Sequence, residues 1–98
     1  MRSIYLVAYD VSDDKRRTKI FKKLKGYGES LQYSLFRCAL TPGERARLRC
    51  EIWPLVDHST DRILLIDLGP DDGRVATALE SWGKPLDDPA AHDGILVI

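Results

Sequence analysis

The chain has 98 residues, 44% of them hydrophobic and 31% charged, which is ordinary for a soluble globular protein of one compact domain. No apolar run approaches the 18 residues of a membrane span, and the N-terminal apolar stretch lacks a signal-peptide layout, so we expect a cytoplasmic protein. The net charge is zero, but residues 1–50 hold twelve Lys or Arg against five Asp or Glu, and residues 51–98 hold three against ten. This asymmetry is typical either of ordinary solvated faces or of a basic surface that binds nucleic acid.

The first predicted element is a strand over residues 3–11, an almost unbroken apolar and β-favouring run that suits a central strand covered on both faces. Residues 12–14, Ser-Asp-Asp, then supply a helix start, with oxygen acceptors for free N–H groups. We expect the helix to continue to about Tyr27 and to be ended by Gly26 and Gly28. Its buried stripe consists of Ile20, Phe21, Leu24 and Tyr27.

Residues 31–40 form the next extended run, and its alternation of polar and apolar residues changes phase. Gln32 and Ser34 share one face of the run, whereas Arg37 lies on the other. A single flat strand does not change face in this way. We therefore predict a bulge or break near Ser34–Phe36 that divides the run into two short strands.

Residues 41–44, Thr-Pro-Gly-Glu, predict the start of a second helix, because they form a capping box with proline at N1. Leu48, Ile52 and Leu55 mark the buried side of this helix. Pro54 would clash with the preceding turn, so the regular helix should end or kink near Trp53.

The C-terminal half begins with a predicted strand over Asp61–Gly69, whose residues 63–66 are apolar enough to be buried on both faces. Asp71 or Asp72 would cap a third, shorter helix, which Val75, Leu79 and Trp82 would line. A polar linker over residues 84–94 leads to a last strand at 95–98, which must pair with a sheet edge in this chain or in a partner. The order β-α-β-β-α-β, then a helix and a strand, predicts a single ferredoxin-like α/β (α+β) sandwich over residues 1–98.

Asp10 is the first candidate for chemistry, since it lies where a buried strand reaches its carboxyl end. Ligands usually bind at this edge in open α/β architectures, and a carboxylate suits Mg²⁺ or Mn²⁺. The alternative is an aspartate that forms the strand-to-helix turn, although residues 12–14 already provide the helix cap. A single carboxylate is a weak basis for a catalytic metal site, so two copies of Asp10 would have to meet at a two-fold axis.

The helix that follows is strongly basic, with seven cations among residues 15–25. This pattern fits either a solvated helix face or a surface for phosphates. Arg17 borders the buried stripe, so it either extends along the surface or is aimed at an anion such as phosphate. The seven cations are Lys15, Arg16, Arg17, Lys19, Lys22, Lys23 and Lys25, and four more arginines could extend the patch, namely Arg37, Arg45, Arg47 and Arg49.

Three aromatic residues near these motifs, Tyr9, Tyr33 and Phe36, are predicted to belong to the core. Phe36 lies at the phase change, so exposure for base stacking or for an interface is the alternative for that ring. Ser34 would bond either to backbone at the bulge or to a phosphate, and the sequence does not decide between them.

Histidines and cysteines form no metal or nucleophile motif in the sequence. His58 and His92 lie in polar stretches without paired acids or cysteines, so we expect no catalytic or metal role for either. Cys38 and Cys50 are too few for a disulfide framework, and we expect core thiols in a reducing compartment. No P-loop, GxSxG, HExxH or GxGxxG motif is present.

Two segments resemble a known family, the second of the two core CRISPR-associated proteins. Residues 9–17, Tyr-Asp-Val-Ser-Asp-Asp-Lys-Arg-Arg, match that family's apolar strand ending in Tyr-Asp, followed by a Ser/Asp start to a basic helix. Residues 31–36, Leu-Gln-Tyr-Ser-Leu-Phe, match its Gln-x-Ser-apolar-Phe strand, in the same order and at the usual distance. The likeness is specific over residues 3–40 and architectural over residues 41–98.

The resemblance implies a ferredoxin-like homodimer that packs sheet to sheet, with residues 84–98 as a dimerisation or partner-binding segment whose last strand crosses to the partner. The two Asp10 side chains would face each other and hold one divalent metal, Mg²⁺ or Mn²⁺, so that Asp10 is both the catalytic and the metal residue. Four further residues match positions linked to nuclease activity in the family, Tyr9, Arg17, Lys19 and Phe36. We add Arg16, Ser34 and Arg37 as supporting or nucleic-acid-binding residues.

The resemblance also implies a role in CRISPR spacer acquisition, in which the dimer bridges integrase subunits and binds protospacer duplex DNA. Family members differ in whether they cut single-stranded RNA, duplex DNA or nothing measurable, so a metal-dependent endonuclease is one expectation and a non-catalytic nucleic-acid-binding module is another. A toxin-like ribonuclease of the same fold is the further alternative. Many members carry a basic residue just before the Gln-x-Ser strand, where this chain has Ser30, and this departure argues against strong RNA cleavage.

Overall fold

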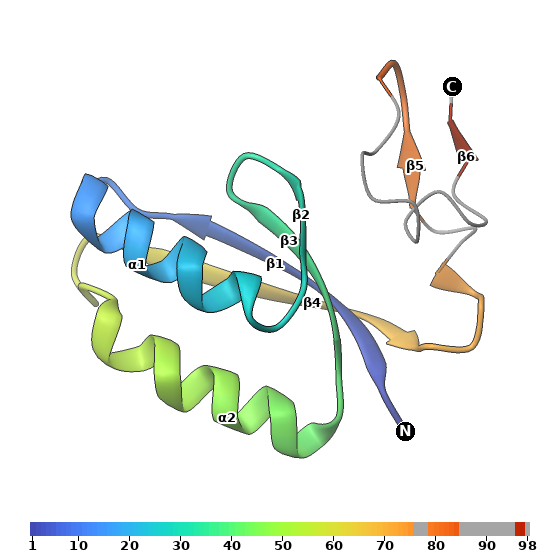
Figure 1. Cartoon of the computed structure of the whole chain (residues 1–98), viewed down its shortest axis with the longest axis horizontal. Helices are drawn as coiled ribbons and strands as arrows, with labels where there is room; N and C mark the ends of the chain where they lie inside the picture. Colours follow the sequence, from blue (N-terminus) through green and yellow to red (C-terminus); the bar gives the residue numbers. More distant parts are fainter. Residues whose placement is uncertain (76–78, 85–95, 98) are drawn as a thin grey trace.

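The computed structural model describes residues 1–75, 79–84 and the backbone of residues 96–97. Four antiparallel strands form one sheet in the order β2-β3-β1-β4, and two helices lie over it (Figure 1). This order is that of the predicted ferredoxin-like sandwich. The elements are β1 (Ser3–Asp10), α1 (Asp14–Lys25), β2 (Glu29–Gln32), β3 (Leu35–Leu40), α2 (Pro42–Ile52), the 3₁₀ turn η1 (Trp53–Leu55), β4 (Arg62–Pro70), β5 (Glu80–Ser81) and β6 (Leu96–Val97).

The core lies between one face of the sheet and the two helices. Alternate residues of β1 and β3 point to this face because successive side chains of a strand point to opposite sides. Truncating one of these large core side chains to alanine costs about 2–5 kcal/mol in typical proteins. The core consists of Val7, Tyr9, Val11, Ile20, Leu24, Phe36, Cys38, Leu40, Leu48 and Ile52.

The helix boundaries follow the local signals of the sequence. The Asp13 side chain accepts a hydrogen bond from the Arg16 N–H at 2.9 Å and caps α1, which ends before Gly26. Thr41 and Glu44 form the predicted capping box of α2. The regular helix ends at Ile52 and continues as the 3₁₀ turn that contains Pro54, as predicted. In the described part of the chain, no helix is long and apolar enough to cross a membrane.

The predicted break in residues 31–40 is a two-residue turn, Tyr33–Ser34, between β2 and β3. Ser34 has φ 65°, in the left-handed region that few residues other than glycine adopt. The Tyr9 N–H donates a hydrogen bond of 3.1 Å to the Ser34 carbonyl and ties the turn to the end of β1. The change of phase in the alternation of polar and apolar residues is therefore caused by a reversal of the chain.

β4 differs from the prediction, because it is an edge strand that pairs with β1 alone in the four-stranded sheet. Its apolar residues Leu64, Leu65 and Ile66 are 51%, 38% and 45% exposed, so the strand is not buried on both faces. β1 is likewise covered by the helices on one face only, and its Leu6 and Ala8 are half-buried. An apolar run cannot distinguish a strand covered within its own chain from one left uncovered.

The C-terminal part also differs from the prediction. Glu80–Ser81 form β5, and Trp82 is 74% exposed, so the predicted third helix does not reach Trp82. β5 pairs in parallel with β6, which gives the last predicted strand a partner within the chain. Positions 76–78 of the predicted third helix lie outside the described residues, as do residues 85–95, which hold most of the predicted linker.

Candidate functional site

Asp10 ends β1 with an exposed side chain on the face of the sheet that the helices leave uncovered. The neighbouring Tyr9 belongs to the core, so the alternation of the strand places Asp10 with Leu6 and Ala8 on the opposite face. The cap of α1 is Asp13, and no hydrogen bond of the Asp10 side chain to the described residues holds the strand-to-helix corner. The fold therefore does not use Asp10 as a turn residue.

One chain offers Asp10 as a single carboxylate and not as a complete metal site. Among residues 1–75 and 79–84, no group of three His, Cys, Asp or Glu side chains gathers in a position to hold a metal ion. Mg²⁺ requires six oxygen ligands in an octahedron. The Asp10 carboxylate is the right kind of donor, but it fits a divalent ion only where a second carboxylate, water or phosphate completes the coordination.

Tyr9 and Phe36 are core residues beneath this strand end. Phe36 is completely buried, with its ring centroid 6.3 Å from that of Tyr9 and 5.4 Å from that of Phe21. Burial raises the pKa of the Tyr9 hydroxyl, and the neighbouring Tyr33 adds to the rise. The core prediction is confirmed for both rings, and base stacking by Phe36 is wrong because no base can reach a buried ring. Phe36 can support the site only by packing.

Arg17 holds the loop that follows Asp10. Its Nη1 donates a hydrogen bond of 2.9 Å to the Val11 carbonyl, and its Nη2 binds the Asp14 carboxylate. The side chain is 28% exposed, so the fold does not cover it completely. Arg17 therefore positions the strand-to-helix connection and still presents a positive charge beside it.

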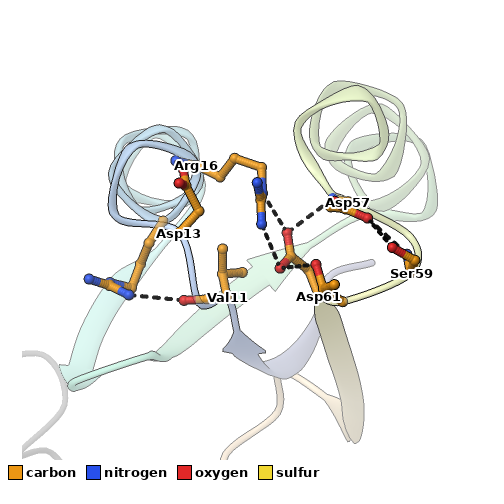
Figure 2. Close-up of polar contacts among 8 residues, drawn as sticks. Val11, Asp13, Arg16, Asp57, Ser59 and Asp61 are labelled. Carbon is orange, nitrogen blue, oxygen red and sulfur yellow. Dashed lines mark hydrogen bonds and ion pairs between the residues drawn. The ribbon is translucent and has the colours of Figure 1, made fainter.

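Arg16 is used by the fold. Figure 2 shows its guanidinium facing Asp61, the residue just before β4, with distances of 2.8 Å from Nε to Oδ2 and 3.1 Å from Nη2 to Oδ1. The Asp61 side chain has no exposed surface and also accepts a hydrogen bond of 3.0 Å from the Asp57 N–H. The paired guanidinium lowers the pKa of Asp61 to about 2. Arg16 is thus an internal partner of Asp61 rather than a free phosphate ligand. The sequence did not predict this ion pair.

A groove of about 840 Å³ between α1 and α2 collects positive side chains, Lys19 among them. Its two acids are already paired, since Glu44 binds Arg2, and Glu51 lies 3.7 Å from Lys23 and accepts a hydrogen bond from Tyr27. The remaining charge is positive and suits phosphate groups. The cations of the groove are Arg2, Lys19, Lys22, Lys23 and Arg47.

Arg37 does not extend this basic surface, contrary to the prediction. It alternates with the buried Phe36 and Cys38 and therefore lies on the uncovered face of the sheet, opposite Leu6 in the register. Its Nη1 lies 3.3 Å from Glu29 Oε2. Its Nε is buried without a hydrogen-bond partner in the part of the chain that the structure describes.

Three other predictions have mixed outcomes. Tyr33 is 83% exposed, so its assignment to the core is wrong. Cys38 is buried, which raises the pKa of its thiol to about 11, whereas Cys50 is exposed and is not a core thiol. Ser34 uses its carbonyl in the turn, and its side chain also interacts with the Tyr9 hydroxyl, so backbone structure rather than phosphate explains its position.

The chain is similar to known proteins over most of its length. The model of a family described as CRISPR associated protein Cas2 matches residues 2–74. A protein of Rhodospirillum rubrum named CRISPR-associated endoribonuclease Cas2 1 is 43% identical over 83 residues, which are 85% of this chain and 80% of that one. A protein of Thermus thermophilus named CRISPR-associated endoribonuclease Cas2 is 41% identical over 91 residues, which are 91% of this chain and 97% of that one.

Solved structures agree with the fold. The crystal structure of a hypothetical protein TT1823 from Thermus thermophilus superimposes with a TM-score of 0.67 at 34% identity, covering 71% of this chain and 96% of that one. The crystal structure of Streptococcus pyogenes Cas2 at pH 6.5 gives 0.66 at 31% identity, covering 74% and 93%. These similarities agree with the ferredoxin-like architecture and with the resemblance seen in residues 9–17 and 31–36.

Proposed function

The chain belongs to the CRISPR-associated Cas2 family, and we propose that it works as a homodimer that binds nucleic acid in CRISPR spacer acquisition. The observation that carries the proposal is the uncovered face of the sheet, which has an apolar part formed by Leu6, Ala8, Leu64 and Ile66, carries Arg37 beside Leu6, and has Asp10 at one end. The family assignment favours this role over that of a toxin-like ribonuclease. The relatives named above are called endoribonucleases, so cleavage of a phosphodiester is the activity to test.

Dimerisation is supported by the apolar residues on the face of the sheet that the helices leave exposed. In the register of the sheet, Leu6 lies opposite Ile66, and Ala8 lies between Leu64 and Leu35. An apolar face beside an unpaired strand edge is a liability in a monomer, because exposing apolar surface to water is unfavourable and the free strand edge can pair with other chains. A second copy that covers this face removes the liability and places two Asp10 carboxylates on the same interface.

Nucleic-acid binding is supported by the groove between α1 and α2, where two of the five cations pair with the two acids and the charge of the other three, Lys19, Lys22 and Arg47, is left over. In a dimer, two such grooves would give a long basic surface for the phosphates of a protospacer duplex. Bridging of integrase subunits is the corresponding role of residues 84–98, which combine acidic residues with a final apolar run.

Cleavage would depend on the paired Asp10 residues. The two carboxylates would hold Mg²⁺ or Mn²⁺, which when bound polarises a phosphate oxygen and lowers the pKa of a water. The chain itself would bind the flanking phosphates through the cations of the groove. Arg17 would fix the backbone just after Asp10 through its hydrogen bond to the Val11 carbonyl. RNA and duplex DNA are both candidate substrates.

The test compares Asp10→Ala with the wild type and with Asp71→Ala, which removes an exposed carboxylate elsewhere. Both variants should remain dimeric and bind duplex DNA, and Asp10→Ala alone should lose any Mg²⁺-dependent cleavage of RNA or DNA. Cleavage retained by highly purified Asp10→Ala would remove Asp10 from the mechanism. A monomeric wild type would refute the shared site.

A further inference from the structure

Tyr33 is an aromatic residue without a place in the core, since 83% of it is exposed. It occupies the first position of the two-residue turn between β2 and β3. Two other aromatic residues with large exposure have contacts that account for them. The ring of Trp53 lies against Arg49 at 4.6 Å and against His58 at 4.2 Å, and Trp82 donates a hydrogen bond of 2.7 Å to Glu80. The Tyr33 hydroxyl interacts with the Arg17 side chain, but among the described residues no ring or cation stacks on the face of its ring.

The turn holds Tyr33 in a defined place. Gln32 and Leu35 pair across it, and Ser34 adopts φ 65°, a conformation that persists in a non-glycine residue only when its surroundings impose it. The Tyr9 N–H supplies one such restraint through its hydrogen bond to the Ser34 carbonyl. A ring on a short, anchored turn loses little conformational entropy when it binds a ligand.

The turn lies at the end of β1 that carries Asp10, next to the start of the basic helix α1. Burial is the largest cause of the raised pKa of the Tyr9 hydroxyl, and Tyr33 is close enough to raise this pKa further. Desolvation lowers the pKa of Arg17, but the Asp14 carboxylate and the Tyr33 hydroxyl more than offset it. An exposed aromatic face thus lies beside a guanidinium and near the candidate catalytic carboxylate.

We propose that Tyr33 is a stacking platform for one unpaired nucleobase and that it gives the protein a preference for single-stranded over duplex nucleic acid. The proposal rests on the proposed function, since it concerns the same nucleic-acid surface. Aromatic side chains stack on bases of any sequence, but a base within a duplex has both faces already stacked on its neighbours. Phosphates held by cations of α1 would be common to both forms, whereas contact with Tyr33 requires an exposed base.

The experiment measures the affinity of the full chain for a short single strand containing 2-aminopurine and for the matching duplex, in RNA and DNA forms. Tyr33→Ser removes the ring, Tyr33→Phe keeps it, and Trp82→Ser removes a different exposed ring as a matched control. We expect Tyr33→Ser to weaken single-strand binding by roughly ten-fold. Duplex binding should stay unchanged, and Tyr33→Phe and Trp82→Ser should behave as wild type. Stacking should also quench 2-aminopurine in the wild type and in Tyr33→Phe, but not in Tyr33→Ser.

The outcomes separate this inference from the proposed function. A wild type that binds neither single strands nor duplexes refutes the proposed function. A wild type that binds, together with a Tyr33→Ser variant of unchanged single-strand affinity, refutes the stacking platform alone. Equal losses for single strand and duplex would also refute it, because they would mean that Tyr33 contacts the backbone. A loss confined to RNA, or one shared by RNA and DNA strands, supports the platform and shows which sugar it accepts.

Discussion

The Arg16 guanidinium donates two hydrogen bonds to the buried Asp61 carboxylate across 45 residues of sequence, at 2.8 Å and 3.1 Å. The pair joins the first turn of α1 to the segment that enters β4 (Figure 2). Two parallel hydrogen bonds between a planar guanidinium and a carboxylate fix orientation as well as distance. The edge strand β4 is therefore held in place at the end where it pairs with Asp10.

This pair predicts a defined response to acid. The pKa of Asp61 is lowered to about 2, so its contribution to stability is fully present above the unfolded value near 3.8 and is lost as the pH falls through about 2. In Asp61→Asn this contribution is absent. Thermal unfolding followed by circular dichroism should show a melting temperature several degrees lower at pH 7, and a smaller further fall between pH 4 and pH 2 than in the wild type.

Two variants sharpen this test. Asp71→Asn removes an exposed carboxylate and should melt as the wild type does at every pH. Arg16→Lys keeps the charge but not the two-pronged geometry, so it should fall between the wild type and Asp61→Asn. Parallel melting curves for the wild type and Asp61→Asn from pH 7 to pH 2 would contradict the assigned role of the pair.

A side chain added at Gly28 should create a packing defect. A Cβ at this position would collide with the Arg37 carbonyl and lie 2.6 Å from Cys38 Sγ. Because a backbone atom cannot move aside cheaply, Gly28→Ala should lower the free energy of unfolding by about 1–3 kcal/mol in urea titrations.

The matched control for Gly28 is Gly43→Ala, near the start of α2, where the nearest atom to an added Cβ lies 4.0 Å away. Alanine is the better helix former, so this variant should gain up to about 1 kcal/mol. Equal effects of the two substitutions would show that the close approach at Gly28 is relaxed in solution.

The groove between α1 and α2 predicts binding of duplex DNA that weakens steeply with salt. Each lysine that contacts a phosphate contributes about 0.9 to the slope of log K against log salt. The double variant Lys19→Ala/Lys22→Ala should therefore reduce the slope by up to about 2, as measured by fluorescence anisotropy over a salt series. Lys84→Ala removes an exposed charge elsewhere and should leave the slope unchanged. A flat salt response of the wild type would count against the basic surface.

The uncovered sheet face predicts a dimer that a charge can break. Leu64 and Ile66 are 51% and 45% exposed in the single chain, and a glutamate at either position would bury a charge in a sheet-to-sheet interface. Leu64→Glu should sediment as a folded monomer where the wild type sediments as a dimer. Ala46→Glu, on the exposed side of α2, should remain dimeric. A Leu64→Glu variant that stays dimeric would move the interface to another surface.

Much of the fold was predictable because its signals are local. The capping box of Thr41 and Glu44 acts within one turn of helix, and the change of face between Ser34 and Arg37 marks the chain reversal. Hydrogen bonds between residues three apart, and the alternation of a strand, require no knowledge of distant residues. The motif around Asp10 was also sufficient to indicate the family.

The tertiary structure decided what depends on distant partners. The sequence alone determined that residues 63–66 form an apolar strand and that residues 15–25 form a basic helix. Only the fold showed that this strand is an uncovered edge, that Arg16 is paired with Asp61, and that Tyr33 is exposed. The physical reason is that burial and ion pairing depend on which residues meet in space, whereas caps and periodicity depend on which residues are neighbours in the chain.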